Sequence, residues 1–318
     1  MKHLLSIESL ETGDLLRILE MTGPLKRGRG KPGGPTPLRG RCWAMIFSKS
    51  STRTRVSFEV GIRELGGDVI FLNAGDIQLG RGEPVRDTAR VLGRMVHGVV
   101  FRTYRQEEVE EFARHSGIPT INALTDQEHP CQILTDLYTL AEAFGAGSGS
   151  AGTIGKTLAG RVVTFVGDAA CNVAVSWVFA AAKLGFEVRL AAPEAYQPSD
   201  AVVGRARALA EKTGGKIVQT PDIRAAAAGA DVLYTDVWIS MGKEDERDKR
   251  IRNLDGYRID GEVVRLARKG ALVMHCLPAY RGMEITDDCF EAHAGTIFEQ
   301  AENRLHTQKA ILSLLEGP

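Results

Sequence analysis

Short apolar runs and longer segments with helical spacing alternate along almost the whole chain. The runs have the length of buried strands, and the segments between them carry apolar residues three and four positions apart. This alternation predicts parallel strands joined by helices that cover both faces of a sheet. The predicted strands are 42–47, 68–72, 98–101, 119–122, 161–166, 187–192, 232–235, 271–274 and 296–299.

Prolines and glycines mark several ends of the predicted helices. Pro84 and Pro130 stand at helix starts, and Gly66 and Gly214 stand at helix ends. The Gly/Pro/Arg-rich residues 23–40 are expected to form a long connection after the first helix. Predicted helices begin near residues 12, 56, 84, 107, 130, 172, 199 and 303.

One glycine- and serine-rich stretch, Gly145–Gly152, interrupts the alternation and is predicted to be a flexible loop or linker. At 318 residues the chain is long enough for two domains. We therefore expect an α/β fold of two doubly wound parallel-sheet domains, with the active site in the cleft between them. The expected domains are 1–145 and 146–302, and the closing helix 303–318 is expected to pack back on the first.

The same stretch holds two misleading nucleotide-binding patterns. Gly147, Gly149 and Gly152 have the spacing of a dinucleotide fingerprint, but they follow a helix and precede a strand, which is the reverse of the required order. Residues 150–157 resemble a phosphate loop, but Ser150 replaces its first glycine. Neither pattern supports a nucleotide cofactor.

Charge and cysteine content exclude several partners and compartments. Forty basic residues balance forty acidic ones, so no overall field favours nucleic acid or an anionic membrane. No apolar run approaches a membrane span, and the first residues are not expected to act as a signal peptide, because acidic residues come early and the apolar run is short. The five cysteines are odd in number and scattered, which indicates a reduced protein in the cytoplasm.

The first candidate site is the turn between the strand at 42–47 and the helix after it. Ser51, Thr52 and Thr54 supply hydroxyls there, and Arg53 and Arg55 supply guanidinium groups. Backbone N–H groups and the positive end of the helix dipole also meet at such a turn, so it can hold a phosphate. The structural alternative is a helix capped by Ser51 or Thr52 with solvated arginines.

Other polar residues follow the ends of further strands, where ligands gather in sheets of this kind. Arg102 could instead be a solvated arginine, His129 a helix-start residue and Cys276 a buried structural thiol. Asp236 is harder to explain structurally, because a carboxylate at the end of an apolar strand needs a partner. The strand ends of the first half are rich in cations and hydrogen-bond donors, whereas those of the second half carry a carboxylate, an amide, a hydroxyl and a thiol. This contrast predicts an anionic ligand on the first domain and an amine on the second. The histidines and cysteines lack the paired spacing of a zinc site.

Six motifs in a fixed order resemble those of the aspartate/ornithine carbamoyltransferase family, and in particular its ornithine carbamoyltransferase branch. The resemblance covers nearly the whole chain. The motifs are Ser-Thr-Arg-Thr-Arg from residue 51, Arg102, His-Pro-x-Gln from residue 129, Asp-Val-Trp-x-Ser-Met-Gly from residue 236, His-Cys-Leu-Pro-Ala from residue 275 and Glu-Asn-Arg-Leu-His from residue 302.

The resemblance implies a role for each matching residue. The residues implied to bind carbamoyl phosphate are Ser51, Thr52, Arg53, Thr54, Gln78, Arg102, His129, Gln132, Cys276, Leu277 and Arg304. Those implied to bind ornithine are Asn172, Asp236, Ser240 and Met241. Those implied to act in catalysis are Arg102, His129, Asp236, Cys276 and Arg304. Gln78 lies in a loop that in this family reaches the site of a neighbouring subunit, and family members are commonly trimers.

The implied reaction joins carbamoyl phosphate and L-ornithine to give L-citrulline and phosphate, with no cofactor and no metal. The resemblance places it in arginine biosynthesis or in urea- or arginine deiminase-type metabolism. Two alternatives remain at this stage. One is a carbamoyltransferase for aspartate, putrescine or an acylated ornithine, although aspartate would require a cation where the chain has Asp236 and Ser240. The other is a protein that only senses ornithine or phosphate.

Overall fold

The computed structural model describes residues 1–73, 75, 77, 82–240 and 242–317. It divides into two compact units. Unit 1 is Met1–Ile154 together with Asn303–Pro318, and unit 2 is Gly155–Glu302. Each unit is built on one parallel sheet with helices on both of its faces, which confirms the predicted fold class.

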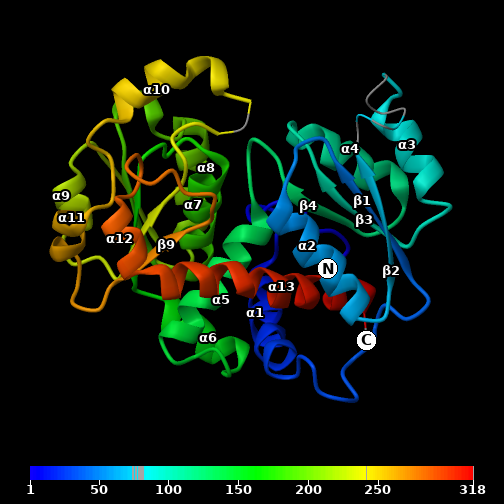
Figure 1. Ribbon diagram of the computed structural model, residues 1–318. Helices are drawn as coiled ribbons and strands as arrows, with labels where there is room; N and C mark the ends of the chain where they lie inside the picture. The colour runs from blue at the N-terminus through cyan, green and yellow to red at the C-terminus, as the bar shows by residue number, and fades with distance from the viewer. Residues whose placement is uncertain (74, 76, 78–81, 241, 318) are drawn as a thin grey trace. The chain divides into compact units, whose positions relative to one another are not determined.

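Unit 1 contains a parallel sheet of four strands in the order β2-β1-β3-β4 (Figure 1). The strands are β1 (Cys42–Phe47), β2 (Asp68–Asn73), β3 (Gly98–Arg102) and β4 (Thr120–Leu124). The helices of this part of the chain are α1 (Thr12–Arg27), α2 (Thr52–Glu64), α3 (Val85–Leu92), α4 (Gln106–Ser116) and α5 (Pro130–Ala143).

The central strand β1 is buried on both faces because helices pack on each. Ala44 and Ile46 belong to an apolar cluster that also includes Ala89 of α3 and Phe112 of α4. Successive side chains of a strand point to opposite faces. Trp43 accordingly reaches the other face, where its indole N–H donates to Glu316 at 3.2 Å.

Unit 2 contains a parallel sheet of five strands in the order β7-β6-β5-β8-β9. The strands are β5 (Val162–Val166), β6 (Glu187–Ala191), β7 (Lys216–Thr220), β8 (Val232–Thr235) and β9 (Leu272–His275). The helices are α7 (Asn172–Leu184), α8 (Asp200–Ala210), α9 (Ile223–Ala227), α10 (Arg247–Leu254), α11 (Gly261–Leu266) and α12 (Asp287–Ala292), with short 3-10 turns at Glu194–Tyr196 and Glu244–Glu246.

The sheet of unit 2 is also covered on both faces, as alternate residues of β8 show. Leu233 packs in an apolar cluster with Ala226 of α9 and Phe290 of α12. The next residue, Tyr234, stacks on Phe165 and meets the ring of Trp177 of α7 edge-on, at a centroid distance of 5.4 Å. Two helices, α6 (Ala151–Leu158) and α13 (Ala294–Glu316), contain the points where the chain passes from one unit to the other.

Two predicted segments differ from the structure, and several elements of the structure have no counterpart in the prediction. The strand predicted at 296–299 is wrong, because these residues lie in α13. Its apolar run is too short to separate strand from helix, and no proline interrupts the sequence that follows. Residues 23–27 belong to α1, which contains Pro24, and the predicted connection starts only afterwards. Strand β7 and helices α6 and α9 to α12 are not among the predicted elements.

The predicted linker at Gly145–Gly152 is more ordered than a flexible loop. Residues 151 and 152 begin α6, and the Gly149 N–H donates to the Ala146 carbonyl at 2.8 Å. Gly147 is required by packing, because a Cβ there would lie 2.9 Å from the Cα of Glu142. The glycines therefore allow a close turn after α5.

None of the described helices combines the length and the apolar character needed to cross a membrane. The five cysteines are all free thiols.

Candidate functional site

The turn between β1 and α2 forms the first part of the site. Ser51 is the N-cap of α2, and its hydroxyl accepts the N–H of Thr54 at 3.2 Å. Thr52 and Arg53 are the first residues of the helix. The cap and the anion site are compatible, because the cap satisfies one N–H of the first turn while the helix dipole still favours an anion there.

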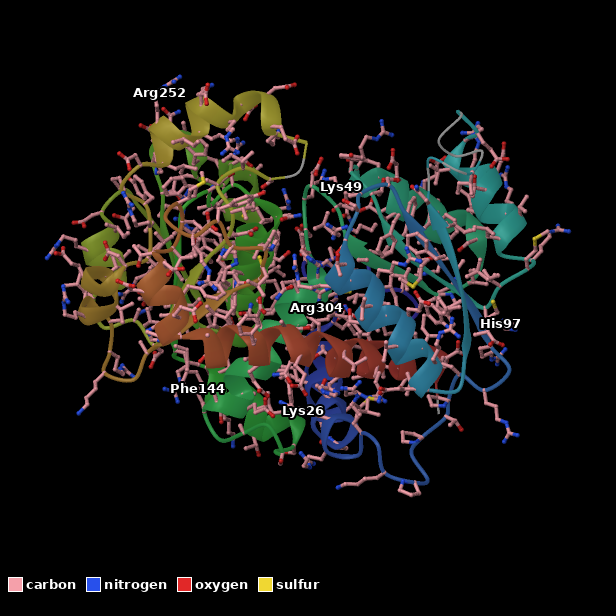
Figure 2. All side chains as sticks on the ribbon, viewed as in Figure 1. Lys26, Lys49, His97, Phe144, Arg252 and Arg304 are labelled. Atoms are coloured by element: carbon pink, nitrogen blue, oxygen red, sulfur yellow. The ribbon has the colours of Figure 1, made fainter. Side chains whose placement is uncertain are left out.

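Arg304 joins this turn to a helix far along the chain. Its guanidinium donates to Oε1 of Gln132 at 2.6 Å and to the hydroxyl of Thr54 at 3.1 Å. The side chain of Arg304, labelled in Figure 2, is buried, with only 3% of its surface exposed. The contacts link α13, α5 and α2, so three sequence-predicted residues meet in one place.

Arg102, the last residue of β3, lies close to the same arginines. Burial, followed by the charges of Arg304 and Arg53, lowers the pKa of Arg102 to about 10. Within the described part of the chain, no carboxylate lies within salt-bridge distance of Arg102. Three guanidinium groups that repel one another are a poor structural arrangement but a good binding site for a dianion.

His129 precedes Pro130, which opens α5, and is 6% exposed. Burial lowers the pKa of His129 well below its ordinary value, and Arg304, Arg102 and Arg53 lower it further. The imidazole is therefore neutral at physiological pH and can donate a hydrogen bond without adding charge.

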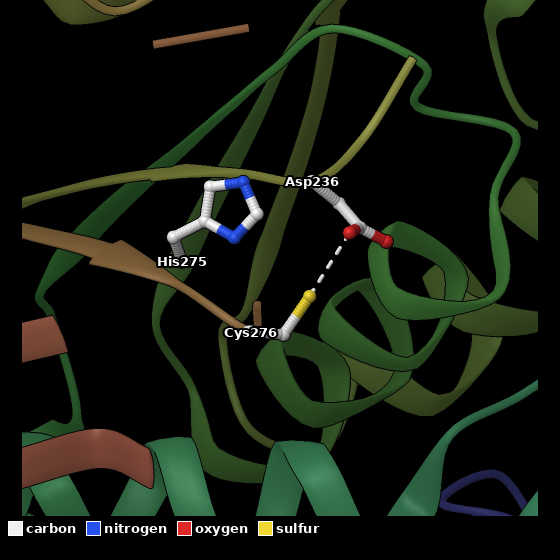
Figure 3. A group of neighbouring side chains, drawn as sticks. All are labelled: Asp236, His275 and Cys276. Atoms are coloured by element: carbon white, nitrogen blue, oxygen red, sulfur yellow. Dashed lines mark hydrogen bonds between the residues drawn. The ribbon is translucent and has the colours of Figure 1, made fainter. Parts of the chain in front are cut away.

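In unit 2, Asp236 and Cys276 follow the adjacent strands β8 and β9. The thiol of Cys276 donates to Oδ1 of Asp236 at 3.0 Å (Figure 3). The same oxygen accepts the N–H of Val237 at 2.8 Å. No described cation lies within salt-bridge distance of Asp236, which is only 9% exposed. A buried carboxylate with this environment is suited to a cationic ligand.

His275 lies beside this pair, but its ring is already engaged. Nδ1 accepts the N–H of Leu277 at 2.8 Å, so Nε2 carries the proton and donates to Glu284 at 3.1 Å. The ligand atoms of Asp236, His275 and Cys276 lie within 4.8 Å of one another, a spacing that could hold a metal ion. Because both nitrogens of His275 have partners, this group offers a metal only a carboxylate and a thiol, fewer than a zinc site needs.

Leu277 has a strained backbone, with a φ of 60° that is unusual for a residue with a side chain. Its N–H is held by His275. The loop after β9 is therefore fixed locally by two buried groups, the His275 ring and Glu284, which also accepts the N–H of Tyr280 at 2.5 Å.

Two further residues predicted to bind ornithine, Asn172 and Ser240, lie in other parts of unit 2. Asn172 is the first residue of α7. Ser240 follows β8, and its carbonyl accepts the N–H of Lys243 at 3.0 Å. Gln78 and Met241 lie outside the described residues.

Sequence reasoning did not single out Lys49 or Glu284. Lys49, labelled in Figure 2, is 5% exposed, forms an ion pair with Asp126 and lies 4.3 Å from the ring centre of Tyr104. Its position between the strand and Ser51 could have indicated it. Glu284 lies in the connection between β9 and α12, nine residues after its partner His275, and no sequence pattern relates the two residues.

Two family models match successive parts of the chain, and the second match extends beyond unit 2 into the residues of α13 that belong to unit 1. Residues 2–142 match the family model described as "Aspartate/ornithine carbamoyltransferase, carbamoyl-P binding domain", and residues 159–315 match "Aspartate/ornithine carbamoyltransferase, Asp/Orn binding domain". The chain belongs to the aspartate/ornithine carbamoyltransferase family.

Members of this family resemble the chain over its whole length. The ornithine carbamoyltransferase of Akkermansia muciniphila is 52% identical over 316 residues, covering 99% of this chain and 98% of the relative. That of Campylobacter fetus is 47% identical over 98% of this chain and 97% of the relative. The crystal structure of the anabolic ornithine carbamoyltransferase of Campylobacter jejuni matches with a TM-score of 0.90 at 41% identity, covering 99% of both chains.

Proposed function

We propose that this protein transfers the carbamoyl group of carbamoyl phosphate to the δ-amine of L-ornithine, giving L-citrulline and phosphate. The observation that carries the proposal is that unit 1 gathers buried positive charge and unit 2 holds a buried carboxylate, in a chain of this family. Arg53, Arg102 and Arg304 gather in unit 1, whereas Asp236 lies beside Cys276 in unit 2. The relatives named above are ornithine carbamoyltransferases.

In this proposal unit 1 binds carbamoyl phosphate. The phosphate is held by the start of α2, from Ser51 to Thr54, and by Arg102. Arg304, His129 and Gln132 contact the carbamoyl group, together with the backbone near Cys276 and Leu277. The hydrogen bonds of Arg304 to Gln132 and Thr54 support this part, because they hold its guanidinium in one orientation.

Unit 2 then binds ornithine. Asn172, Asp236, Ser240 and Met241 bind its α-amino and α-carboxylate ends, and Cys276 with Asp236 lies beside the δ-amine. The buried carboxylate of Asp236, with no described cation beside it, supports this assignment. Aspartate is disfavoured as the acceptor, because its side-chain carboxylate would be repelled by the carboxylate of Asp236.

The reaction needs a neutral amine. The δ-amine has an ordinary pKa near 10, so it must lose a proton before its lone pair attacks the carbamoyl carbon. Attack forms a C–N bond and a tetrahedral intermediate, and the C–O bond to phosphate then breaks. Donors from Arg102, Thr54, His129 and Arg304 would stabilise the charge on the carbonyl oxygen and the departing phosphate. No step requires a redox group, a metal or a covalent enzyme intermediate.

A comparison of acceptors tests the proposal. Purified protein with carbamoyl phosphate is given ornithine, putrescine, aspartate or N-acetylornithine, and release of phosphate is measured together with the carbamoylated product. Ornithine is expected to give the highest kcat/KM, with one citrulline formed for each phosphate released. A higher kcat/KM with another acceptor would contradict the choice of substrate, and the absence of any transfer would leave only a binding protein.

We also propose a homotrimer in the cytoplasm, acting in arginine metabolism. In this assembly a subunit interface could cover exposed apolar side chains of unit 1, which include Val56, Ile70, Val91 and Met95. In this assembly Gln78 would serve the site of a neighbouring subunit. The free thiols fit a reducing compartment. Light scattering after size exclusion is expected to give three times the mass of one chain or a multiple of it.

A further inference from the structure

Arg250 connects three parts of unit 2 through one side chain. Its guanidinium donates to Oδ2 of Asp168 at 2.7 Å and to the backbone carbonyl of Trp238 at 3.2 Å, both from Nη1. Its Nε donates to Glu246 at 2.8 Å. Arg250 lies in α10, Asp168 follows β5, and Trp238 follows β8. The side chains of the central pair are buried, with 11% of Arg250 and 7% of Asp168 exposed.

Trp238 is fixed independently of this contact. It is 3% exposed, and its indole N–H donates to the carbonyl of Tyr257 at 3.3 Å. Its ring lies 3.5 Å from the position that a Cβ would take on Gly167, whose φ is +122°. Arg250 thus attaches α10 to a fixed point just after Asp236, and Ser240 lies in the segment between these attachments.

Arg250 also determines the local balance of charge. Asp168 and Asp236 act on one another, since the charge of Asp236 adds to burial in raising the pKa of Asp168. The same two carboxylates, after burial, raise the pKa of the neighbouring Cys171. Arg250 is the cation that faces Asp168. Asp236, by contrast, has the N–H of Val237 and the thiol of Cys276.

We propose that Arg250 is a positioning residue for the amine substrate, a role that rests on the proposed function. By holding Asp168 and the carbonyl of Trp238 together, it fixes the segment that starts two residues after Asp236 and carries Ser240. By neutralising Asp168, it leaves Asp236 as the carboxylate that meets the cationic substrate. Arg250 itself does not touch the reacting atoms.

The matched test compares Arg250→Gln with Arg252→Gln. Arg252 is an exposed residue of the same helix, labelled in Figure 2. For Arg250→Gln we expect KM for ornithine to rise at least 10-fold, while KM for carbamoyl phosphate changes less than 3-fold, because that substrate is assigned to unit 1. Arg252→Gln is expected to keep both constants. Equal rises in both KM values, or no change in either, would overturn the proposal.

Two further variants separate positioning from loss of folding. Arg250→Lys keeps the charge, but all its donors lie on one nitrogen, so it cannot reach the partners that Nε and Nη1 of Arg250 contact together. Its KM for ornithine is expected to lie between those of the native protein and Arg250→Gln. Adding Asp168→Asn to Arg250→Gln should restore part of the affinity, because the uncompensated carboxylate is then removed. A double variant worse than either single one would contradict the electrostatic part.

Hydrogen exchange tests, without any measurement of turnover, whether Arg250 holds the segment between Trp238 and Arg250 in place. In the free protein, peptides within 242–249 are expected to exchange at least 10-fold faster in Arg250→Gln than in Arg252→Gln, with peptides of unit 1 unchanged. Equal exchange in the two variants would show that Arg250 does not hold this segment in place. If the native protein makes no citrulline but this difference is found, the proposed function fails and the positioning contact stands.

Discussion

The thiol of Cys276 donates to the carboxylate of Asp236 across 3.0 Å, although 40 positions separate the two residues in the chain. The contact follows from the pairing of β8 with β9. Thr235 lies opposite His275 in the parallel register, so the residues that leave the two strands next are Asp236 and Cys276. Adjacent strand ends therefore place a thiol and a carboxylate at one point of the sheet edge.

The charge of Asp236 is expected to be essential for the use of ornithine. Asp236→Asn keeps the size of the side chain but removes the charge, so kcat/KM for ornithine should fall roughly 100-fold, which corresponds to about 2.7 kcal/mol. Steady-state kinetics with each substrate varied in turn measures the effect. The control is Asp245→Asn, at an exposed position of the segment that follows. Unchanged ornithine kinetics in Asp236→Asn would remove Asp236 from the binding site.

The activity of the protein is expected to depend on the planar arrangement of N–H donors in the guanidinium of Arg304. Arg304→Lys keeps the positive charge but cannot bond Gln132 and Thr54 in the same geometry, so kcat with saturating substrates should fall roughly 100-fold. Circular dichroism should show an intact fold. Arg63→Lys, at a side chain that is 58% exposed, serves as the control and should be fully active. A fully active Arg304→Lys would show that charge alone suffices.

Burial of His129 gives stability a dependence on pH. The pKa of His129 is lower in the folded protein than in the unfolded chain, so the unfolded chain binds an extra proton below about pH 6.5. The contribution of His129 to the free energy of unfolding is therefore fully present above that pH. It is lost as the pH decreases towards the folded pKa, by up to about 1.4 kcal/mol per pH unit.

Urea unfolding at several pH values checks this effect. His129→Gln should lose part of the slope below about pH 6.5, whereas His115→Gln, in the last turn of α4, should retain it. Identical slopes in native protein and His129→Gln would show that His129 takes up a proton in the folded state.

The pair of His275 and Glu284 is expected to stabilise unit 2. Both side chains are 0% exposed, and His275→Leu leaves Glu284 without its ring donor, which should cost about 3 kcal/mol of unfolding free energy. Adding Glu284→Leu removes the buried carboxylate as well. The double variant should therefore be more stable than His275→Leu, and urea unfolding of both would detect the difference. A double variant that loses the sum of both effects would exclude this coupling.

Local sequence patterns predicted most of the strands and the residues that follow them. The N-cap at Ser51 and the helix start at Pro130 depend on neighbours within one turn, so the sequence alone determines them. Short apolar runs determine β1, β5 and β8 because a central strand is buried on both faces. The same signal misassigned residues 296–299, which lie within the first turns of α13.

Only the tertiary structure decided which of these residues meet. Thr54 and Arg304 are 250 positions apart, and Asp168 and Arg250 are 82 apart, so no local pattern relates them. Their contacts depend on strand order and helix packing, which are set by burial of apolar surface across the whole unit. The sequence determined the chemical groups and the turns that carry them, and folding determined their partners, because hydrogen bonds and charges act over a few ångströms in space rather than along the chain.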